Sequence, residues 1–191
     1  MQVVAGTARR ILLKTIPGEE TRPTSNRIKE TLFNILQPQI QGCRFLDLFA
    51  GSGAIGIEAL SRGAREAVFV EKSRLASACI LDNLTRTHLK DQAQIMTTDV
   101  LAAIKRLSSG GKAFDIIFLD PPYDAGYEEE VLQELAASPL VMSETLIICE
   151  MRIRRELKDL SESGLTVVRV KEYKNNKHVF LRKAGEENEQ D

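Results

Sequence analysis

The sequence has no tryptophan, two histidines and three cysteines among its 191 residues. Cys43, Cys79 and Cys149 are far apart and odd in number, which argues against a disulfide framework and excludes a Cys-x-x-Cys metal site. His88 and His178 are also distant from each other in the chain. Because zinc sites need several such ligands at close spacing, we expect no metal centre.

Long apolar runs are missing as well. The apolar stretches are strand-sized, whereas crossing a bilayer takes roughly 18 to 20 consecutive apolar residues. No long apolar segment accompanies Arg9 and Arg10, whereas a secretory signal needs an apolar core there. With 43% hydrophobic residues, the chain can bury one domain-sized core. We therefore expect a cytoplasmic monomer with no membrane-spanning helix.

Charge is nearly balanced overall but unevenly distributed. The formal net charge of −1 argues neither for nor against a nucleic-acid partner. The first 40 residues, however, carry six basic and three acidic side chains, whereas the last six are mostly acidic and lack apolar anchors. This distribution predicts a basic N-terminal segment and a disordered tail over residues 184–191.

Short apolar runs alternate with helical periodicity from Cys43 onward. Strands are predicted over 43–48, 66–71, 93–98, 114–119 and 144–150, with helices over 53–62, 73–88, 100–107, 127–136 and about 154–161. Such alternation indicates an α/β fold with a parallel sheet, and the run 114–119, apolar on both faces, belongs in its middle. The last two runs, 165–173 and 177–183, are neighbours and predict an antiparallel hairpin.

The chain before Cys43 predicts a small appendage. Residues 1–15 contain Gly6 and suit a short hairpin. An amphipathic helix follows up to Pro38, with its apolar face formed by Ile28, Leu32, Ile35 and Leu36. We therefore divide the chain into an N-terminal hairpin and helix (1–40), a main catalytic domain (41–183) and the tail (184–191).

A glycine-rich segment, DLFAGSGAIG from Asp47 to Gly56, follows the first predicted strand and opens a helix. Its glycines allow close approach of the backbone to a ligand, and the first helical turn offers unpaired N–H groups at a positive dipole end. Gly51, Gly53 and Gly56 also satisfy the GxGxxG pattern of dinucleotide enzymes. A tight strand-to-helix turn without any ligand is the simpler alternative.

Acidic residues close the next two strands. Glu71 stands 20 residues after Gly51, where a carboxylate can accept both hydroxyls of a ribose, whether of NAD or of S-adenosylmethionine. Alternatively, Glu71 only favours the N-terminus of the following helix. Asp99 is either a helix N-cap or an acceptor for an adenine amino group, and the sequence leaves both interpretations open.

The segment Asp120-Pro121-Pro122-Tyr123 directly follows the predicted central strand. Two prolines remove N–H donors, leaving carbonyl groups and the Asp120 carboxylate as acceptors for an incoming amine. Two acceptors can hold the hydrogens of an exocyclic base amine and direct its lone pair at a sulfonium methyl, while Tyr123 stacks on the base. A rigid loop with an incidental tyrosine is the alternative.

Together, DLFAGSGAIG and DPPY resemble the class I amino-methyltransferases. Residues 1–183 are similar, more specifically, to the RsmD family of 16S ribosomal RNA guanine-N2 methyltransferases. The stretch RPTSNRIKETLFN, from Arg22 to Asn34, closely matches that family's N-terminal signature, which generic methyltransferases lack. Two positions depart from the family: Arg10 stands where its hairpin usually has a second glycine, and Lys174 where a glycine often follows the tyrosine.

The resemblance implies a seven-stranded, mostly parallel sheet with an antiparallel last strand, and S-adenosylmethionine bound over the glycine-rich turn. The residues that it implies for the cofactor are Asp47, Ala50, Gly51, Ser52, Gly53, Glu71 and Asp99. Asp120, Pro121 and Tyr123 would handle the target guanine, with Arg9, Arg10, Arg22 and Arg27 facing RNA and Thr24 near the mouth of the site. The implied partner is 16S ribosomal RNA, or a small ribosomal subunit during assembly.

Three competing functions remain open from the sequence. An NAD-dependent oxidoreductase would use GxGxxG and Glu71 but leaves DPPY unexplained. An inert RNA-binding module would use the basic N-terminal segment, and the intact Asp120 and Tyr123 argue against it. An adenine-N6 methyltransferase presents a similar amine, and only the resemblance separates it from a guanine-N2 enzyme.

Overall fold

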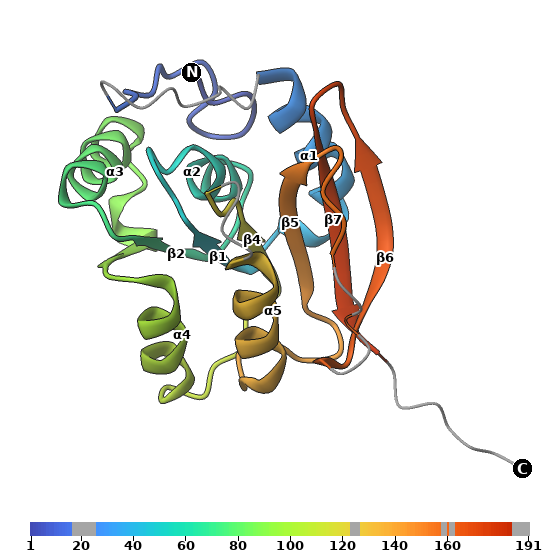
Figure 1. The fold of residues 1–191 in the computed structure, drawn as a ribbon. Coiled ribbons are helices and arrows are strands. Elements are labelled where there is room, and N and C mark those ends of the chain that lie inside the picture. The colour runs from blue at the N-terminus through green and yellow to red at the C-terminus, as the bar shows by residue number, and fades with distance from the viewer. Residues whose placement is uncertain (17–25, 123–126, 158–159, 161–162, 185–191) are drawn as a thin grey trace, which may run out of the picture.

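A seven-stranded sheet with helices on both faces forms the protein in the computed structural model, which describes residues 1–16, 26–122, 127–157, 160 and 163–184 (Figure 1). The strands are β1 (Arg44–Leu48), β2 (Glu66–Glu71), β3 (Ala93–Thr97), β4 (Ile116–Leu119), β5 (Leu146–Arg152), β6 (Leu165–Glu172) and β7 (Asn176–Lys183). The helices are α1 (Asn26–Ile40), α2 (Ala54–Ser61), α3 (Arg74–Thr87), α4 (Val100–Ser108) and α5 (Tyr127–Ala137), with a short 3-10 helix, η1 (Lys90–Gln92), before β3.

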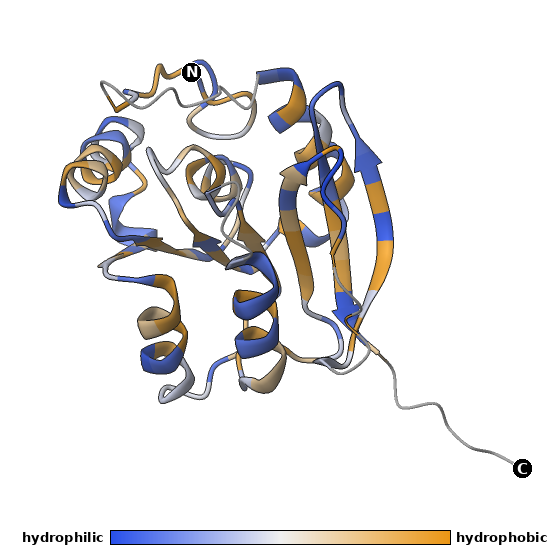
Figure 2. Ribbon diagram, in the orientation of Figure 1, coloured by the Kyte–Doolittle hydropathy of each residue, from blue (hydrophilic) through white to orange (hydrophobic). Residues whose placement is uncertain are grey.

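The strand order is β3-β2-β1-β4-β5-β7-β6, with β4 in the middle. Strands β1 to β5 run parallel, whereas β7 is antiparallel to both β5 and β6. Every residue of β4 is buried, because helices cover both of its faces. The predicted parallel sheet, its central strand and its terminal hairpin are confirmed, and the middle strands are mostly hydrophobic (Figure 2).

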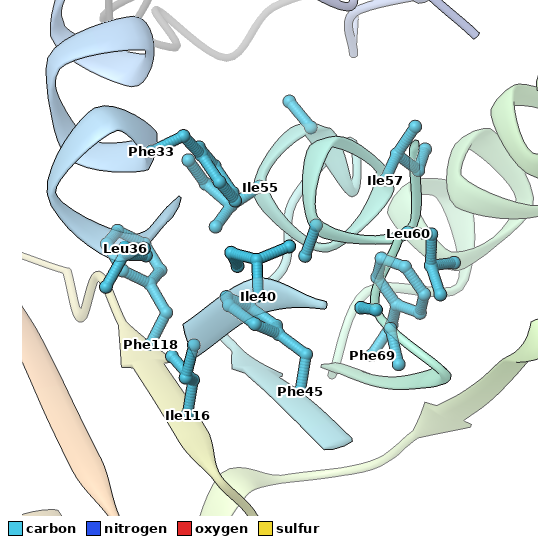
Figure 3. Packing of buried hydrophobic residues seen from close by; sticks show 14 of the residues in the cluster. Phe33, Leu36, Ile40, Phe45, Ile55, Ile57, Leu60, Phe69, Ile116 and Phe118 are labelled. Atoms are coloured by element: carbon cyan, nitrogen blue, oxygen red, sulfur yellow. The ribbon is translucent and has the colours of Figure 1, made fainter. Parts of the chain in front are cut away.

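Two hydrophobic clusters lie on opposite faces of the sheet. Helices α1, α2 and α3 cover one face, where Phe33 of α1 and Phe45 of β1 are fully buried and stack with ring centroids 6.4 Å apart (Figure 3). Helices α4 and α5 cover the other face. Because side chains alternate along a strand, Phe118 of β4 points to the α1 face and Leu119 to the α5 face.

The N-terminal segment, residues 1–16, forms a hairpin with a single bridge between Gln2 and Leu12. It packs on α2, where the buried Ser61 hydroxyl donates to the carbonyl of Ala5 and accepts from the amide of Ala8. Gly6 has φ 84°, and a side chain on it would collide with the Ser61 carbonyl at 1.7 Å. Only glycine fits at this contact.

Two predicted helices differ in the structure. Helix α1 continues through Pro38 to Ile40, since the missing proline N–H costs one bond in the last turn while Ile40 is fully buried. The helix predicted near 154–161 is not formed by its described residues. Residues 153–154 make a turn, and Arg155 instead bonds the Glu129 carboxylate of α5 at 2.9 and 3.0 Å.

Among the described residues, no helix is long and apolar enough to span a membrane.

Candidate active site

The candidate site lies where the carboxyl ends of β1, β2, β3 and β4 meet at one edge of the sheet. The register sets Leu48 of β1 opposite Val70 of β2 on one side and Leu119 of β4 on the other. The segments that follow these strands are therefore neighbours, and they contain the glycine-rich turn, Glu71 and Asp120. In open α/β sheets, ligands bind in the crevice beyond such strand ends.

The glycine-rich turn has a left-handed backbone. Gly51 and Gly53 have φ angles of 54° and 79°, and Gly53 is the N-cap of α2. The predicted strand, turn and helix are thus confirmed. At Gly51 an added Cβ would meet nothing within 4 Å, so the backbone there borders open space. Ala50 is buried below it, and Ser52 is half-buried.

Asp47 is buried at the end of β1 and contacts the start of α2. Its side chain is buried, and Oδ2 accepts a hydrogen bond from the Gly56 amide at 2.9 Å. Burial raises the pKa of Asp47 to about 7, the Gly56 bond opposes that shift, and the nearby Glu71 adds to it. The carboxyl group therefore holds the start of α2 against the end of β1.

Glu71 closes β2 and binds the turn directly. One carboxylate oxygen accepts from the Gly51 amide at 2.9 Å and the other from the Ser73 amide at 2.8 Å. The side chain is half-buried, and a carboxylate has about four lone-pair sites. Glu71 can therefore brace the turn and still accept hydroxyl hydrogens from a ligand.

Asp99 is the N-cap of α4, with Oδ1 accepting from the Leu101 amide at 2.9 Å. Its other oxygen, Oδ2, accepts from the Tyr127 hydroxyl at 3.1 Å. Tyr127 makes an edge-to-face contact with Phe49, with ring centroids 5.8 Å apart. Capping is thus one function of Asp99, and these two aromatic rings beside it form an apolar wall that the sequence analysis did not identify.

Asp120 directly follows β4, between the segments that follow β1 and β5. It is half-buried, Pro121 is buried and Pro122 is exposed. Burial raises the pKa of the Cys149 thiol in β5, and the charges of Glu128 and Asp120 add to that shift. The backbone carbonyls and carboxylate of this segment thus follow the central strand at the same edge as Glu71.

Asn83 of α3 joins the N-terminal segment to the glycine-rich turn, and sequence reasoning missed it. This fully buried amide accepts from the Lys14 amide at 2.8 Å and donates to the Lys14 carbonyl at 3.1 Å and the Ser52 carbonyl at 2.9 Å. No motif marks an asparagine in the middle of a helix, so only the folded chain shows these contacts.

Three of the four predicted RNA-binding arginines lie on the N-terminal segment and α1. Arg9, Arg10 and Arg27 are exposed, whereas Arg22 lies outside the described residues, as do Thr24 and Tyr123. Arg10 has φ 71°, a left-handed conformation, at the position where the resemblance expects glycine. A non-glycine residue in this conformation costs about 1 kcal/mol.

The described residues contain no group of three or more histidine, cysteine, aspartate or glutamate side chains that could hold a metal ion.

Comparison with known proteins decides the family. Residues 1–182 match the model of a family described as "Conserved hypothetical protein 95". Ribosomal RNA small subunit methyltransferase D of Haemophilus influenzae is 35% identical over 151 residues, 78% of each chain. The Escherichia coli K12 protein of the same name is also 35% identical, over 82% of this chain and 77% of its own. The chain belongs to the RsmD family.

Solved structures agree with this membership. The Escherichia coli protein yhhF has a TM-score of 0.83 at 31% identity, over 96% of this chain and 98% of its own. A hypothetical protein of Thermus thermophilus has a TM-score of 0.81 at 30% identity, over 95% and 99% of the two chains. The RsmD resemblance is thus confirmed, and the sheet order with its reversed β7 is that of the class I methyltransferase fold.

Proposed function

We propose that this protein transfers a methyl group from S-adenosylmethionine to the exocyclic N2 amine of a guanine in 16S ribosomal RNA. One observation carries the proposal: in a member of the RsmD family, the glycine-rich turn, Glu71 and the Asp120-Pro121 segment follow adjacent strands at one edge of the sheet. Two relatives reported above are named as methyltransferases of small-subunit ribosomal RNA.

The residues at this edge fit S-adenosylmethionine. Gly51 borders open space, so the backbone of the turn from Ala50 to Gly53 can lie against the cofactor. Glu71 offers acceptors for the ribose hydroxyls, and Asp99 offers them for the adenine amino group beside the rings of Phe49 and Tyr127. When bound, the cofactor supplies an electrophilic methyl group on a sulfonium. Asp47 supports the turn.

Asp120 and the carbonyl groups beside Pro121 act on the target amine. The N2 amine of guanine is a weak nucleophile, because its lone pair is delocalised into the ring. Acceptors that hold its two hydrogens favour a pyramidal nitrogen whose lone pair points out of the ring plane. The amine loses its proton only as the new bond forms, so Asp120 orients the amine more than it deprotonates it. Tyr123 is proposed to stack on the base.

A methyl-transfer assay tests the reaction and its target together. The protein is incubated with labelled S-adenosylmethionine and undermethylated small ribosomal subunits or free 16S RNA, and the modified nucleoside is identified by mass spectrometry. N2-methylguanosine is the expected product. N6-methyladenosine would instead support the adenine alternative, and no transfer with either RNA would contradict the proposal.

The Asp120→Ala variant tests the role of the carboxylate. Turnover should fall by at least about 10²- to 10³-fold, the range for loss of one transition-state hydrogen-bond partner. Binding of S-adenosylhomocysteine, measured by calorimetry, should persist. Asp91→Ala, on the exposed η1, is the control and should remain active. Near-normal turnover of Asp120→Ala would refute the proposed role of the carboxylate in orienting the amine. Selective binding of NAD in place of S-adenosylhomocysteine would instead support an NAD-dependent oxidoreductase.

RNA binding is assigned to the exposed arginines Arg9, Arg10 and Arg27, together with Arg22. Replacing Arg9 and Arg10 with alanine should weaken RNA binding and lower the salt dependence of log K by about 2, one for each lost phosphate contact. Arg106→Ala, on α4 across the sheet, is the matched control. An unchanged salt slope in the double variant would place the RNA elsewhere.

A further inference from the structure

A buried chain of polar side chains lies beside Asp120 and has no part in the function described so far. Glu150 of β5 and His178 of β7 face each other in the antiparallel register, and both are buried. Glu150 Oε2 lies 3.1 Å from His178 Nε2, and Glu150 Oε1 accepts from the Asn176 amide nitrogen at 2.6 Å. His178 Nδ1 lies 3.2 Å from the hydroxyl of Tyr173, which is half-buried and directly follows β6.

These linked polar side chains lie at the same edge and on the same face of the sheet as Asp120. Cys149 is paired with Leu119, so Glu150 is the neighbour of Asp120 one residue further along both strands. Strand alternation points Glu150 and Asp120 to the α1 face, where the rings of Phe118 and His178 meet edge-to-face at 5.9 Å. Tyr173 lies next to His178 on that face, with centroids 5.1 Å apart.

The tautomer of His178 sets the direction of these hydrogen bonds. A carboxylate only accepts hydrogen bonds, so His178 carries its hydrogen on Nε2 and donates it to Glu150. With an uncharged imidazole, Nδ1 is then an acceptor for the hydrogen of the Tyr173 hydroxyl. Burial raises the pKa of Tyr173 to about 12, and the charge of Glu150 adds to this shift. The phenol therefore keeps its hydrogen at neutral pH. The remaining lone pair of the Tyr173 oxygen can only accept.

We infer that Tyr173 presents this acceptor to the target base and selects guanine through its N1–H, with His178 and Glu150 as positioning residues. The inference rests on the proposed function, because it assumes that Asp120 holds the N2 amine. Guanine has a hydrogen on N1, next to the carbon that bears N2, whereas adenine has a lone pair on N1. An acceptor facing the guanine N1–H forms a bond, and the same acceptor facing an N1 lone pair is repelled.

The test compares guanine with 2-aminopurine, which keeps the amine but has a lone pair on N1. Small subunits are reassembled with RNA that carries either base at the methylated position, once that position has been mapped. The wild-type protein should prefer guanine in kcat/KM. In Tyr173→Phe this preference should fall by about 10- to 100-fold, the effect of one directed hydrogen bond. Glu172→Gln, exposed on the other face of β6, should keep it.

The Glu150→Gln variant should shift the base preference toward 2-aminopurine. The oxygen of the new amide should still accept from Asn176, so the amide N–H would face His178 Nε2 and move the ring hydrogen to Nδ1. Tyr173 would then accept from His178 and direct its own hydrogen outward, shifting the preference toward 2-aminopurine. A purely structural role would lower both rates equally.

The outcomes separate the two proposals. If the wild-type protein methylates neither RNA, the proposed function fails. If it methylates guanine but Tyr173→Phe keeps the wild-type preference, or Glu150→Gln shifts it further toward guanine, the Tyr173 inference is overturned while the proposed function stands.

Discussion

The buried carboxylate of Glu58 should be the most sensitive charged group for stability. Its side chain, on α2, is fully buried and accepts hydrogen bonds from four donor groups. Oε2 accepts from the Val4 amide at 2.8 Å and Lys29 Nζ at 3.0 Å; Oε1 accepts from the Ala5 amide at 3.0 Å and Arg62 Nε at 2.8 Å. The N-terminal hairpin, α1 and α2 are therefore joined at one anion.

The Glu58→Gln substitution keeps the shape and removes half of the acceptors. The one oxygen that remains can serve one pair of donors, but the new NH₂ group must then face the other pair, leaving buried N–H groups unpaired. Lys29 also loses the neutralising charge while fully buried. Breaking one side of a buried, hydrogen-bonded ion pair costs about 3 to 5 kcal/mol. For a chain of this size, that corresponds to a melting temperature lower by about 10 °C.

Thermal and urea unfolding, followed by circular dichroism, measure this loss. Glu144→Gln is the control, because Glu144 is 90% exposed in its pair with Arg182 and exposed pairs contribute about 0 to 1 kcal/mol. A double-mutant cycle with Lys29→Met separates the Lys29–Glu58 ion pair from the bonds that Glu58 accepts from backbone amides. The stability loss of the double variant should be smaller than the sum of the losses of the two single variants. If Glu58→Gln lowered the free energy of unfolding by less than about 1 kcal/mol, or if the effects of the two single variants simply added, the buried Glu58–Lys29 pair would not have the stabilising role given to it here.

Two further variants test the supports of the glycine-rich turn. The pKa of Asp47 is about 7 in the folded protein against 3.8 in the unfolded chain, so the folded state binds more protons between these pH values and its stability falls as pH rises through them. Asp47→Asn should remove this pH-dependent loss of stability, so the urea midpoint of the variant should rise relative to that of the wild type between pH 5 and pH 8. A difference between the two midpoints that does not change with pH would contradict the raised pKa of Asp47. Asn83→Ala breaks the bonds to Lys14 and Ser52 and should weaken S-adenosylhomocysteine binding by about 10-fold, the effect of a lost buried hydrogen bond. Calorimetry with Thr85→Ala, an exposed position on α3, is the comparison, and equal affinities of the two variants would show that Asn83 does not position the turn.

Local patterns predicted what local physics controls. The GxGxxG turn needs left-handed backbone at Gly51 and Gly53, and the sequence marks this need directly through glycine. The apolar run 114–119 predicted a central strand, because only a strand covered on both faces tolerates such a run. The helix expected near 154–161 is not formed by its described residues, where residues 153–154 make a turn and the Arg155 side chain pairs with Glu129 of α5.

The sequence by itself thus determined the α/β class, most of the order of strands and helices, and the segments that we propose to carry the chemistry, because these depend on periodicity, glycine and proline over a few residues. Only the tertiary structure decided which distant side chains meet. Asp47 accepts from the Gly56 amide, Asn83 reaches Lys14, and His178 joins Glu150 to Tyr173. Such pairings follow from strand register and helix packing, which act between residues far apart in the chain and leave no local pattern.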